Sequence, residues 1–105
     1  MISTVPMKRV IIIGDETAEH QILDEIHALG ATGYTSYAVH GSGTKGNRPR
    51  HGEPGNVKIE VIATAELAQQ ILEHIAGHYF KDYTMIAYID DVEVIRGAKF
   101  GAKIT

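Results

Sequence analysis

The sequence predicts a single α+β domain in which two helices cover one face of an antiparallel β-sheet. The length of 105 residues suits one domain with a core of its own. Apolar runs of strand type and two amphipathic helical patterns follow one another in the order β-α-β, loop, β-α-β, β. The two β-α-β halves begin about fifty residues apart, which is typical of a ferredoxin-like βαββαβ sandwich. The last strand is an extra C-terminal strand added to that sandwich.

The first half is predicted as strand, helix and strand. Residues 8–13 form a β-branched run that ends at Gly14-Asp15. Asp15 or Thr17 is the expected N-cap of the following helix, and Gly30 is its expected C′ residue. A second strand is expected over residues 33–39. The first helix presents one apolar stripe, which consists of Ala18, Ile22, Ile26 and Leu29.

The second half repeats this order and adds a strand. Residues 57–61 alternate strictly between apolar and polar side chains, which predicts a half-buried strand. Thr64 is the expected N-cap of the second helix. A strand over residues 85–89, a turn at Asp90-Asp91 and a fifth strand over residues 92–96 complete the chain. The buried face of the second helix is expected to consist of Leu67, Ile71, Ile75 and Tyr79.

Two of the predicted strands are apolar on both faces. In residues 85–89 the alternate side chains of both sets are apolar, and residues 10–13 are all Val or Ile. A sheet with one face open to water should be polar on that face. The second apolar face therefore predicts further burial, most simply by self-association into an oligomer.

The composition excludes several classes of protein. With 44% hydrophobic and 22% charged residues, the chain matches a soluble globular protein. No apolar run approaches the roughly 20 residues of a membrane span, and the first residues lack the features of a signal peptide. Without cysteine, neither a disulfide nor a thiolate metal site can form. The net charge of −3 argues against general nucleic-acid affinity. We therefore expect a cytoplasmic protein.

The loop at residues 40–56 is the most unusual segment. It contains five glycines, two prolines and three cationic residues against Glu53 alone, whereas the whole chain carries a net charge of −3. This concentration of positive charge favours a local anion site. A loop of this length is uncommon in a small domain unless it is functional. The alternative is a solvated connector whose charge has no role.

Residues 41–46 superficially resemble a P-loop, but the match fails. The lysine precedes the last glycine, no Ser or Thr follows it, and Pro49 blocks the helix that a P-loop requires. Glycines still allow consecutive backbone N–H groups to surround an anion. Arg48 and Arg50 could add bidentate contacts to phosphate oxygens.

Other candidate residues carry weaker signals. His74 and His78 are spaced i and i+4, as in metal chelates, but no zincin pattern is present and we expect this pair to face solvent. His20 and His27 are expected on the surface as well. No nucleophile elbow exists, and Asp90-Asp91 indicates turn chemistry rather than acid–base catalysis. The sequence identifies no catalytic residue.

Three stretches resemble the PII-like signalling proteins. They are GATGYT at residues 30–35, GSGTKGNR at residues 41–48, and YFKDY at residues 79–83 with the strand that follows. The nearest similarity is to the SbtB-type, carboxysome-associated (CPII) branch, which is linked to inorganic-carbon acquisition, and it covers residues 8–97. It implies that residues 1–105 form one PII-like domain, trimeric, with a T-loop at about 41–56 and a B-loop at about 79–84.

The resemblance also implies a site for adenine nucleotides in clefts between subunits. Met85, Ala87 and Ile89 would contribute backbone groups near adenine, and Arg96 would reach the phosphate from the neighbouring subunit. Bicarbonate would bind beside the phosphates. The implied nucleotide-binding residues are Thr35, Gly41, Gly43, Lys45, Arg48, Arg50, Met85, Ala87, Ile89 and Arg96. The implied anion-binding residues are Ser42, Thr44 and Lys45.

By this resemblance the protein is a non-catalytic sensor of ADP or AMP with bicarbonate, and ATP or cyclic AMP are further candidate ligands. No other cofactor is expected. Its T-loop would order on binding and regulate inorganic-carbon acquisition through a membrane bicarbonate transporter or a carboxysome-related protein. Three alternatives stay open: a slow nucleotide phosphohydrolase, a metal-responsive trimer that uses His74 and His78, and a protein-interaction module that needs no ligand.

Overall fold

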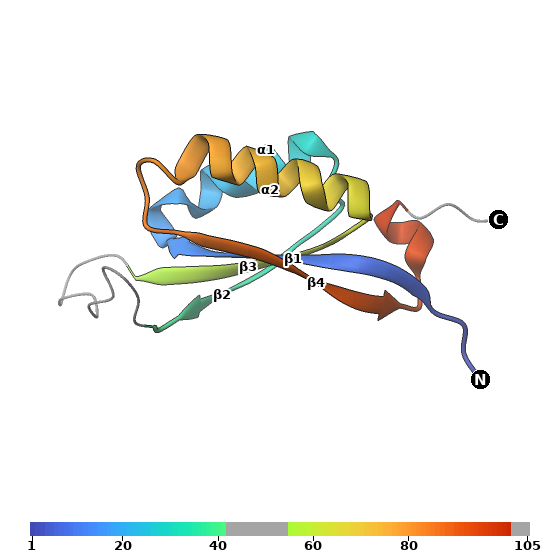
Figure 1. Ribbon diagram of the computed structural model, residues 1–105. Coiled ribbons are helices and arrows are strands. Elements are labelled where there is room, and N and C mark those ends of the chain that lie inside the picture. Colours follow the sequence, from blue (N-terminus) through green and yellow to red (C-terminus); the bar gives the residue numbers. More distant parts are fainter. Residues whose placement is uncertain (42–54, 102–105) are drawn as a thin grey trace.

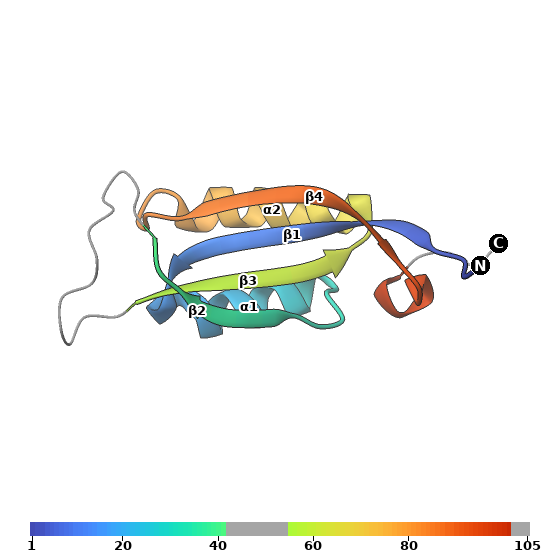
Figure 2. The same cartoon turned by 90° about the horizontal axis from the view of Figure 1, so that it is seen from below.

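The computed structural model describes residues 1–41 and 55–101 as a two-layer sandwich (Figure 1). Helices α1 (Glu19–Leu29) and α2 (Ala65–Tyr79) lie side by side on one face of a four-stranded sheet. The strands are β1 (Val5–Asp15), β2 (Thr35–Val39), β3 (Asn56–Ala63) and β4 (Ile86–Val94). They lie in the order β2-β3-β1-β4, and every neighbouring pair is antiparallel (Figure 2). The predicted ferredoxin-like α+β sandwich is confirmed.

The helix boundaries follow local capping signals. The Asp15 carboxylate accepts a hydrogen bond from the Thr17 backbone N–H at 2.9 Å and caps a short 3-10 turn, η1 (Glu16–Ala18), which leads into α1. At the other end of α1, Gly30 has a φ of 122°, a conformation that side chains with a Cβ rarely adopt. Thr64 caps α2, because its hydroxyl oxygen accepts the Leu67 N–H at 3.2 Å.

The core lies between the two helices and the sheet. The predicted stripes are largely confirmed, although Leu29 and Leu67 lie at the edge of the core and are only partly buried. Ala68 takes the buried position at the start of α2. The central members of the core come from both layers and are Val10, Ile12, Ile59, Val61, Ile22, Ile26, Ile71 and Ile75, each at most 2% exposed.

The predicted turn at Asp90-Asp91 and the separate fifth strand are wrong. Both aspartates lie inside β4, which pairs without interruption with β1. In that register Asp90 is opposite Arg9 and Asp91 is opposite Lys8. Opposite charges placed directly across two strands stabilise their pairing, so two residues typical of turns are held in strand conformation. After Val94 the chain enters a short 3-10 helix, η2 (Gly97–Phe100), instead of another strand.

The sheet face away from the helices mixes apolar and charged residues. Ile86 and Tyr88 are 56% and 43% exposed there. In the register Tyr88 is opposite Ile11, and Ile11 is opposite Glu60. The predicted second apolar face is therefore present, but a row of charged side chains crosses it.

Candidate functional site

Three segments that are far apart in the sequence meet at one end of the sheet. In the strand register Val39 is opposite Asn56, Asn56 is opposite Asp15, and Ile13 is opposite Ile86. The end of β2, the start of β3, the end of β1 and the start of β4 therefore share this end, as Figure 1 shows. The Glu16 N–H donates to the Gly55 carbonyl at 3.0 Å and ties the start of η1 to the residue before β3. We refer to this region as the loop end of the sheet.

The loop end includes Gly41 and Gly55, the described residues on either side of residues 42–54. Gly41 is exposed, and no atom lies within 4 Å of the position where it would carry a Cβ. The structure therefore shows no close contact that requires glycine there. The other predicted residues of this segment lie outside the described residues; they are Ser42, Gly43, Thr44, Lys45, Arg48 and Arg50.

The predicted residues around β4 turn their side chains toward the core. Met85 is 9% exposed, and a Cβ on Gly14 would lie only 2.8 Å from its terminal methyl carbon. Ala87 and Ile89 also pack against the core. In the described part of the chain β4 pairs with β1 alone, so backbone N–H and C=O groups on its outer edge are available to a ligand or another chain. This geometry thus allows these residues to contact a nucleotide through their backbone groups.

Arg96 lies at the opposite end of the sheet from the loop end. Strand β4 spans nine residues from Ile86 to Val94, which corresponds to about 25–30 Å at roughly 3.3 Å per residue. Arg96 is exposed just beyond Val94 and precedes the buried Gly97. A Cβ on Gly97 would lie 2.9 Å from the Cβ of Val5, so close packing fixes the chain directly after Arg96. Within one chain, Arg96 and the loop end cannot form a single site.

Thr35 occupies a third position, at the first residue of β2. It is exposed and opposite Glu60 in the middle of β3. Strand β2 is the other edge of the described sheet. The predicted residues that the structure describes are therefore spread over two sheet edges and two sheet ends.

The turn after α2 is anchored through Tyr79. The Tyr79 carbonyl accepts the N–H groups of Asp82 at 3.1 Å and Tyr83 at 2.9 Å. The side chain of Tyr79 is 1% exposed. The predicted B-loop at about 79–84 thus begins from a fixed point in the core, while Phe80 at its start is 46% exposed.

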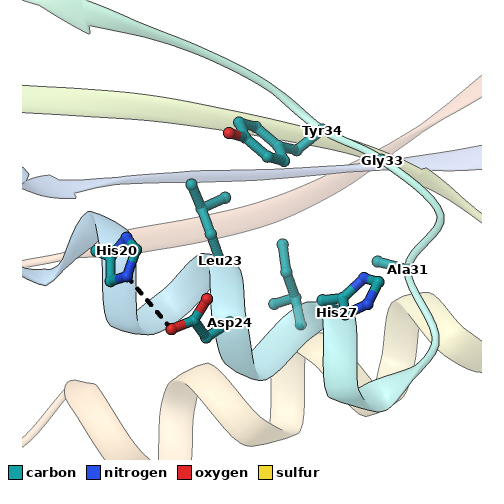
Figure 3. Close-up of a pocket in the computed structure, with 8 residues that line it drawn as sticks. His20, Leu23, Asp24, His27, Ala31, Gly33 and Tyr34 are labelled. Carbon is teal, nitrogen blue, oxygen red and sulfur yellow. Dashed lines mark ion pairs between the residues drawn. The ribbon is translucent and has the colours of Figure 1, made fainter.

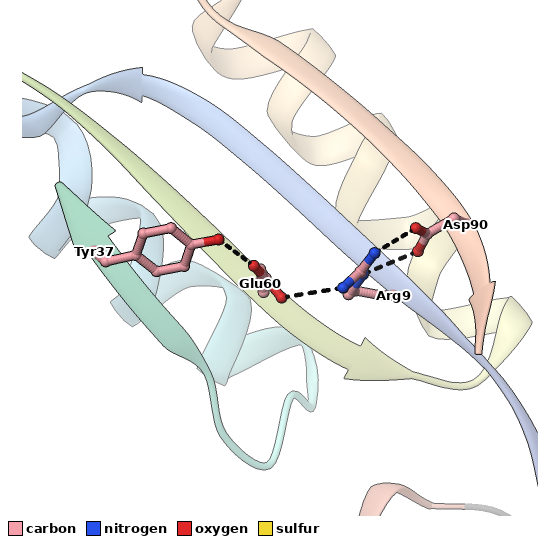
Figure 4. Close-up of polar contacts among 4 residues, drawn as sticks. All are labelled: Arg9, Tyr37, Glu60 and Asp90. Carbon is pink, nitrogen blue, oxygen red and sulfur yellow. Dashed lines mark hydrogen bonds and ion pairs between the residues drawn. The ribbon is translucent and has the colours of Figure 1, made fainter. Parts of the chain in front are cut away.

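A polar network that the sequence analysis did not single out crosses the open face of the sheet (Figure 4). Arg9 on β1 donates two hydrogen bonds to Asp90, from Nε at 3.0 Å and from Nη2 at 2.6 Å. Its Nη1 lies 3.5 Å from Glu60 on β3, and the Tyr37 hydroxyl on β2 donates to Glu60 at 2.6 Å. One chain of contacts therefore links all four strands.

Hydrogen bonding to Arg9 lowers the pKa of Asp90, so the carboxylate stays charged in this pair. The signal for the network was visible in the sequence as the basic pair Lys8-Arg9 and the acidic pair Asp90-Asp91. It could be interpreted only with the antiparallel register, because the register brings these two pairs together.

A shallow hollow of about 280 Å³ lies between α1 and the start of β2 (Figure 3). Among its polar side chains, His20 Nε2 and Asp24 Oδ2 are 3.5 Å apart, and both residues are mostly exposed. His20 and His27 are on the surface, as predicted. None of the predicted nucleotide-binding residues that the structure describes lines this hollow, which is formed by His20, Leu23, Asp24, Ile26, His27, Ala31, Gly33 and Tyr34.

The prediction that His74 faces solvent is wrong. Its side chain is only 20% exposed, and its Nε2 lies 2.6 Å from Glu25 Oε1 on α1. His78 is exposed, and its Nδ1 lies 2.9 Å from the His74 carbonyl oxygen. Within residues 1–41 and 55–101, no group of three or more His, Asp or Glu side chains is arranged to hold a metal ion. No helix in these ranges is both long and apolar enough to cross a membrane.

Comparison with known families gives one match over most of the chain. The family model of nitrogen regulatory protein P-II matches residues 7–99. Among solved structures, the chain is similar to a protein from Thermus thermophilus that is described as a PII-like signalling protein. The two chains share 34% sequence identity, the match covers 94% of this chain and 99% of that one, and the TM-score is 0.81.

The fold is also shared with CPII, a nitrogen regulatory PII-like protein from Thiomonas intermedia K12. In a structure bound to ADP, AMP and bicarbonate, CPII is 24% identical, with 95% of this chain and 98% of that chain covered and a TM-score of 0.86. For the apo form of CPII the values are 22% identity, 90% and 97% coverage and a TM-score of 0.72. At these identities the likeness is one of fold.

Proposed function

Because this chain belongs to the nitrogen regulatory protein P-II family, we propose that it is a regulatory PII-like protein that binds ADP or AMP together with bicarbonate. The match of the family model confirms the family predicted from the sequence. The proposal of these ligands depends on one observation above all. CPII, which shares the fold along nearly its whole length, has been solved with ADP, AMP and bicarbonate bound.

The arrangement of the loop end supports a phosphate site there. The described residues Gly41 and Gly55, which bound the cationic segment in the sequence, lie at this end of the sheet. Three cationic residues in that segment, Lys45, Arg48 and Arg50, match the charge of a nucleotide phosphate chain. Backbone groups on the outer edge of β4 are suited to the adenine base. Ser42 and Thr44 are the proposed hydroxyl donors to bicarbonate.

The position of Arg96 supports a site between subunits. A side chain about 25–30 Å from the loop end of its own sheet can reach a phosphate there only from another copy of the chain. A trimer would bring the two ends together in three equivalent clefts. The open sheet face, with Ile86 and Tyr88 exposed, offers apolar surface for such an assembly.

We propose that regulation proceeds through the T-loop at about residues 41–56. Binding of a nucleotide would meet part of the entropic cost of ordering this segment, so bicarbonate or a protein partner would then bind more readily. The partner classes that fit the proposed role in inorganic-carbon acquisition are a membrane bicarbonate transporter and a carboxysome-related protein. In this proposal the protein acts by binding and catalyses no reaction.

Calorimetry tests the ligand assignment directly. ADP, AMP, ATP and cyclic AMP are titrated into the protein with and without bicarbonate. We expect ADP or AMP to bind and bicarbonate to strengthen the binding. Arg48→Ala and Arg50→Ala should each weaken it by roughly tenfold or more, the effect of one lost charge-assisted hydrogen bond. His20→Ala is the control, because His20 is an exposed basic side chain of α1 in the hollow that none of the described candidate residues lines. Absence of binding by all four nucleotides at millimolar concentration would refute the proposal.

A further inference from the structure

A polar cluster joins α1 to α2 on the helical side of the molecule, away from the open sheet face. Glu25 on α1 is its centre. Its Oε1 accepts a hydrogen bond from the Tyr79 hydroxyl at 2.7 Å and lies 2.6 Å from His74 Nε2. Its Oε2 accepts a hydrogen bond from Gln21 Nε2 at 3.1 Å. Two side chains from α2 therefore converge on one carboxylate oxygen of α1.

Two members of the cluster keep their protonation state around neutral pH. Burial alone would raise the pKa of Glu25, but the hydrogen bonds from His74, Tyr79 and Gln21 together lower it, so the group stays a carboxylate. Burial, with the hydrogen bond to Glu25, raises the pKa of Tyr79, so its hydroxyl stays a donor. Histidine is the side chain type whose charge changes between about pH 5 and pH 8. The imidazoles are thus the groups through which the cluster can respond to pH.

His74 contacts a carboxylate on α1 and the ring of a second imidazole on α2. A proton on His74 turns its contact with Glu25 into a charge-assisted N⁺–H···O⁻ bond, about twice as strong as a neutral one. The His78 ring stacks on the His74 ring with 4.1 Å between centroids, so a second positive charge there would repel the first. The titratable groups in this environment are Glu25 on α1, His78 and Tyr79 on α2, and Tyr83 in the following turn, whose ring lies 5.7 Å from that of Tyr79.

The cluster is joined to the turn after α2 through Tyr79. The side chain of this residue binds Glu25, and its carbonyl accepts the N–H groups of Asp82 and Tyr83. The turn then leads through Met85, which packs beneath Gly14, into β4. The strength with which α1 holds Tyr79 therefore affects how firmly the turn is fixed.

We propose that Glu25, His74 and Tyr79 form a proton-responsive clasp that fixes the turn after α2 and thereby adjusts nucleotide affinity to pH. A proton on His74 strengthens the clasp and holds the turn in place, so nucleotide affinity rises as the pH falls through the range in which histidine side chains become charged. The residues of the clasp act by positioning and do not touch the nucleotide. This inference depends on the proposed function, because it assigns the turn at residues 80–85 to the nucleotide site.

The first experiment tests the clasp without any ligand. Melting temperatures are measured at about pH 6 and about pH 8.5 for the wild type, Glu25→Gln, His74→Gln and the double variant. Glutamine keeps the size and a hydrogen-bonding group at both positions. We expect the coupling between the two positions to be larger at the lower pH by about 3 °C in melting temperature. Equal coupling at both pH values would overturn the clasp.

The same set of single and double variants at His20 and Asp24, measured at the same two pH values, is the matched control. This pair on α1 also consists of an imidazole and a carboxylate, but the two are 3.5 Å apart and their side chains are 94% and 72% exposed. Exposed pairs of this kind contribute little, so we expect no pH-dependent coupling between them.

The second experiment tests the connection to the nucleotide site. ADP affinity is measured by calorimetry at the same two pH values in the wild type, Glu25→Gln, His74→Gln and Asp24→Asn. We expect the ratio of the two affinities to fall by about fivefold in both clasp variants, at the low end of typical coupling between sites, and to be unchanged in Asp24→Asn. An unchanged ratio in both clasp variants would overturn the adjustment of affinity. If the wild type binds no ADP, the proposed function fails, whereas the melting temperatures still decide whether the clasp exists.

Discussion

Arg96 provides a direct test of whether the nucleotide site lies between subunits. Two variants are compared, Arg50→Ala in the cationic segment and Arg96→Ala beyond β4. In the proposed site each variant removes one charge-assisted contact to phosphate, worth roughly 1.5–3 kcal/mol, so each alone should weaken ADP binding roughly 10- to 150-fold. The nine residues of β4 hold Arg96 at the opposite end of the sheet from the loop end of the same chain. In the proposed site between subunits, the two defects therefore belong to different clefts of one subunit.

This separation predicts how the two variants complement each other. If they are co-expressed with different affinity tags and purified by both, every trimer contains both kinds of subunit. One cleft in each mixed trimer then receives an intact Arg50 from one subunit and an intact Arg96 from its neighbour. About one third of the sites should therefore recover the affinity of the wild type. Calorimetry would report this as a tight component with a stoichiometry of about one nucleotide per trimer.

A different result would refute a nucleotide site shared between two subunits. If both arginines served a site within one chain, each subunit would carry one defect in its own site and no intact site could form. Mixed trimers would then bind as weakly as the two single variants. Trimers assembled from two differently tagged copies of Arg96→Ala are the control, because they share the preparation but contain no intact Arg96.

Three further predictions concern packing and charge. Gly97→Ala places a Cβ 2.9 Å from Val5 and should destabilise the fold by about 1–3 kcal/mol. Gly77→Ala in α2 meets no atom within 4 Å and should stabilise the fold by about 0.5–1 kcal/mol. Urea unfolding measures both changes in stability, and changes of the same sign would contradict the packing argument. Asp90→Asn should lower the melting temperature at low salt and less so at high salt, because it removes the charge opposite Arg9; a loss that does not depend on salt would argue against the ion pair. The pKa of Glu25 is lower in the folded chain than its ordinary value of 4.5, so the part of its stabilising contribution that comes from its own ionisation is complete above that value and is lost as the pH falls through the folded pKa. Acid titration of the stability difference between the wild type and Glu25→Gln should follow this course, and a difference that persists in acid would contradict it.

Much of the fold could be predicted because short-range patterns determine which side of each element is buried. Ile22 and Ile26 on α1, and Ile71 and Ile75 on α2, recur at helical spacing and are buried as expected. The caps at Asp15 and Thr64 are equally local, because each accepts a hydrogen bond from a backbone N–H two or three residues away. In the same way, the alternation in β4 indicated that Met85, Ala87 and Ile89 share one face, which the core covers.

Such patterns predicted less of the candidate site, because its parts come from different elements. The resemblance to PII-like proteins indicated the cationic segment and the turn after α2. The basic pair Lys8-Arg9 and the acidic pair Asp90-Asp91 are visible in the sequence, but no pattern indicates that their members join Glu60 and Tyr37 in one network across all four strands. Their meeting depends on the order and register of the sheet.

Local residue preferences were sufficient wherever an element's neighbours in the sequence decided its conformation, and they failed where a distant segment did. Asp90-Asp91 has the composition of a turn, but Lys8 and Arg9 lie directly opposite, and pairing with β1 holds these residues extended. His74 is outside the apolar stripe of α2, but Glu25 on the adjacent helix offers a carboxylate at 2.6 Å. Arg96 follows β4, and the length of this strand holds it far from the loop end of the same sheet. In each case the deciding contact or distance joins residues far apart in the sequence, and such relations exist only once the chain has folded.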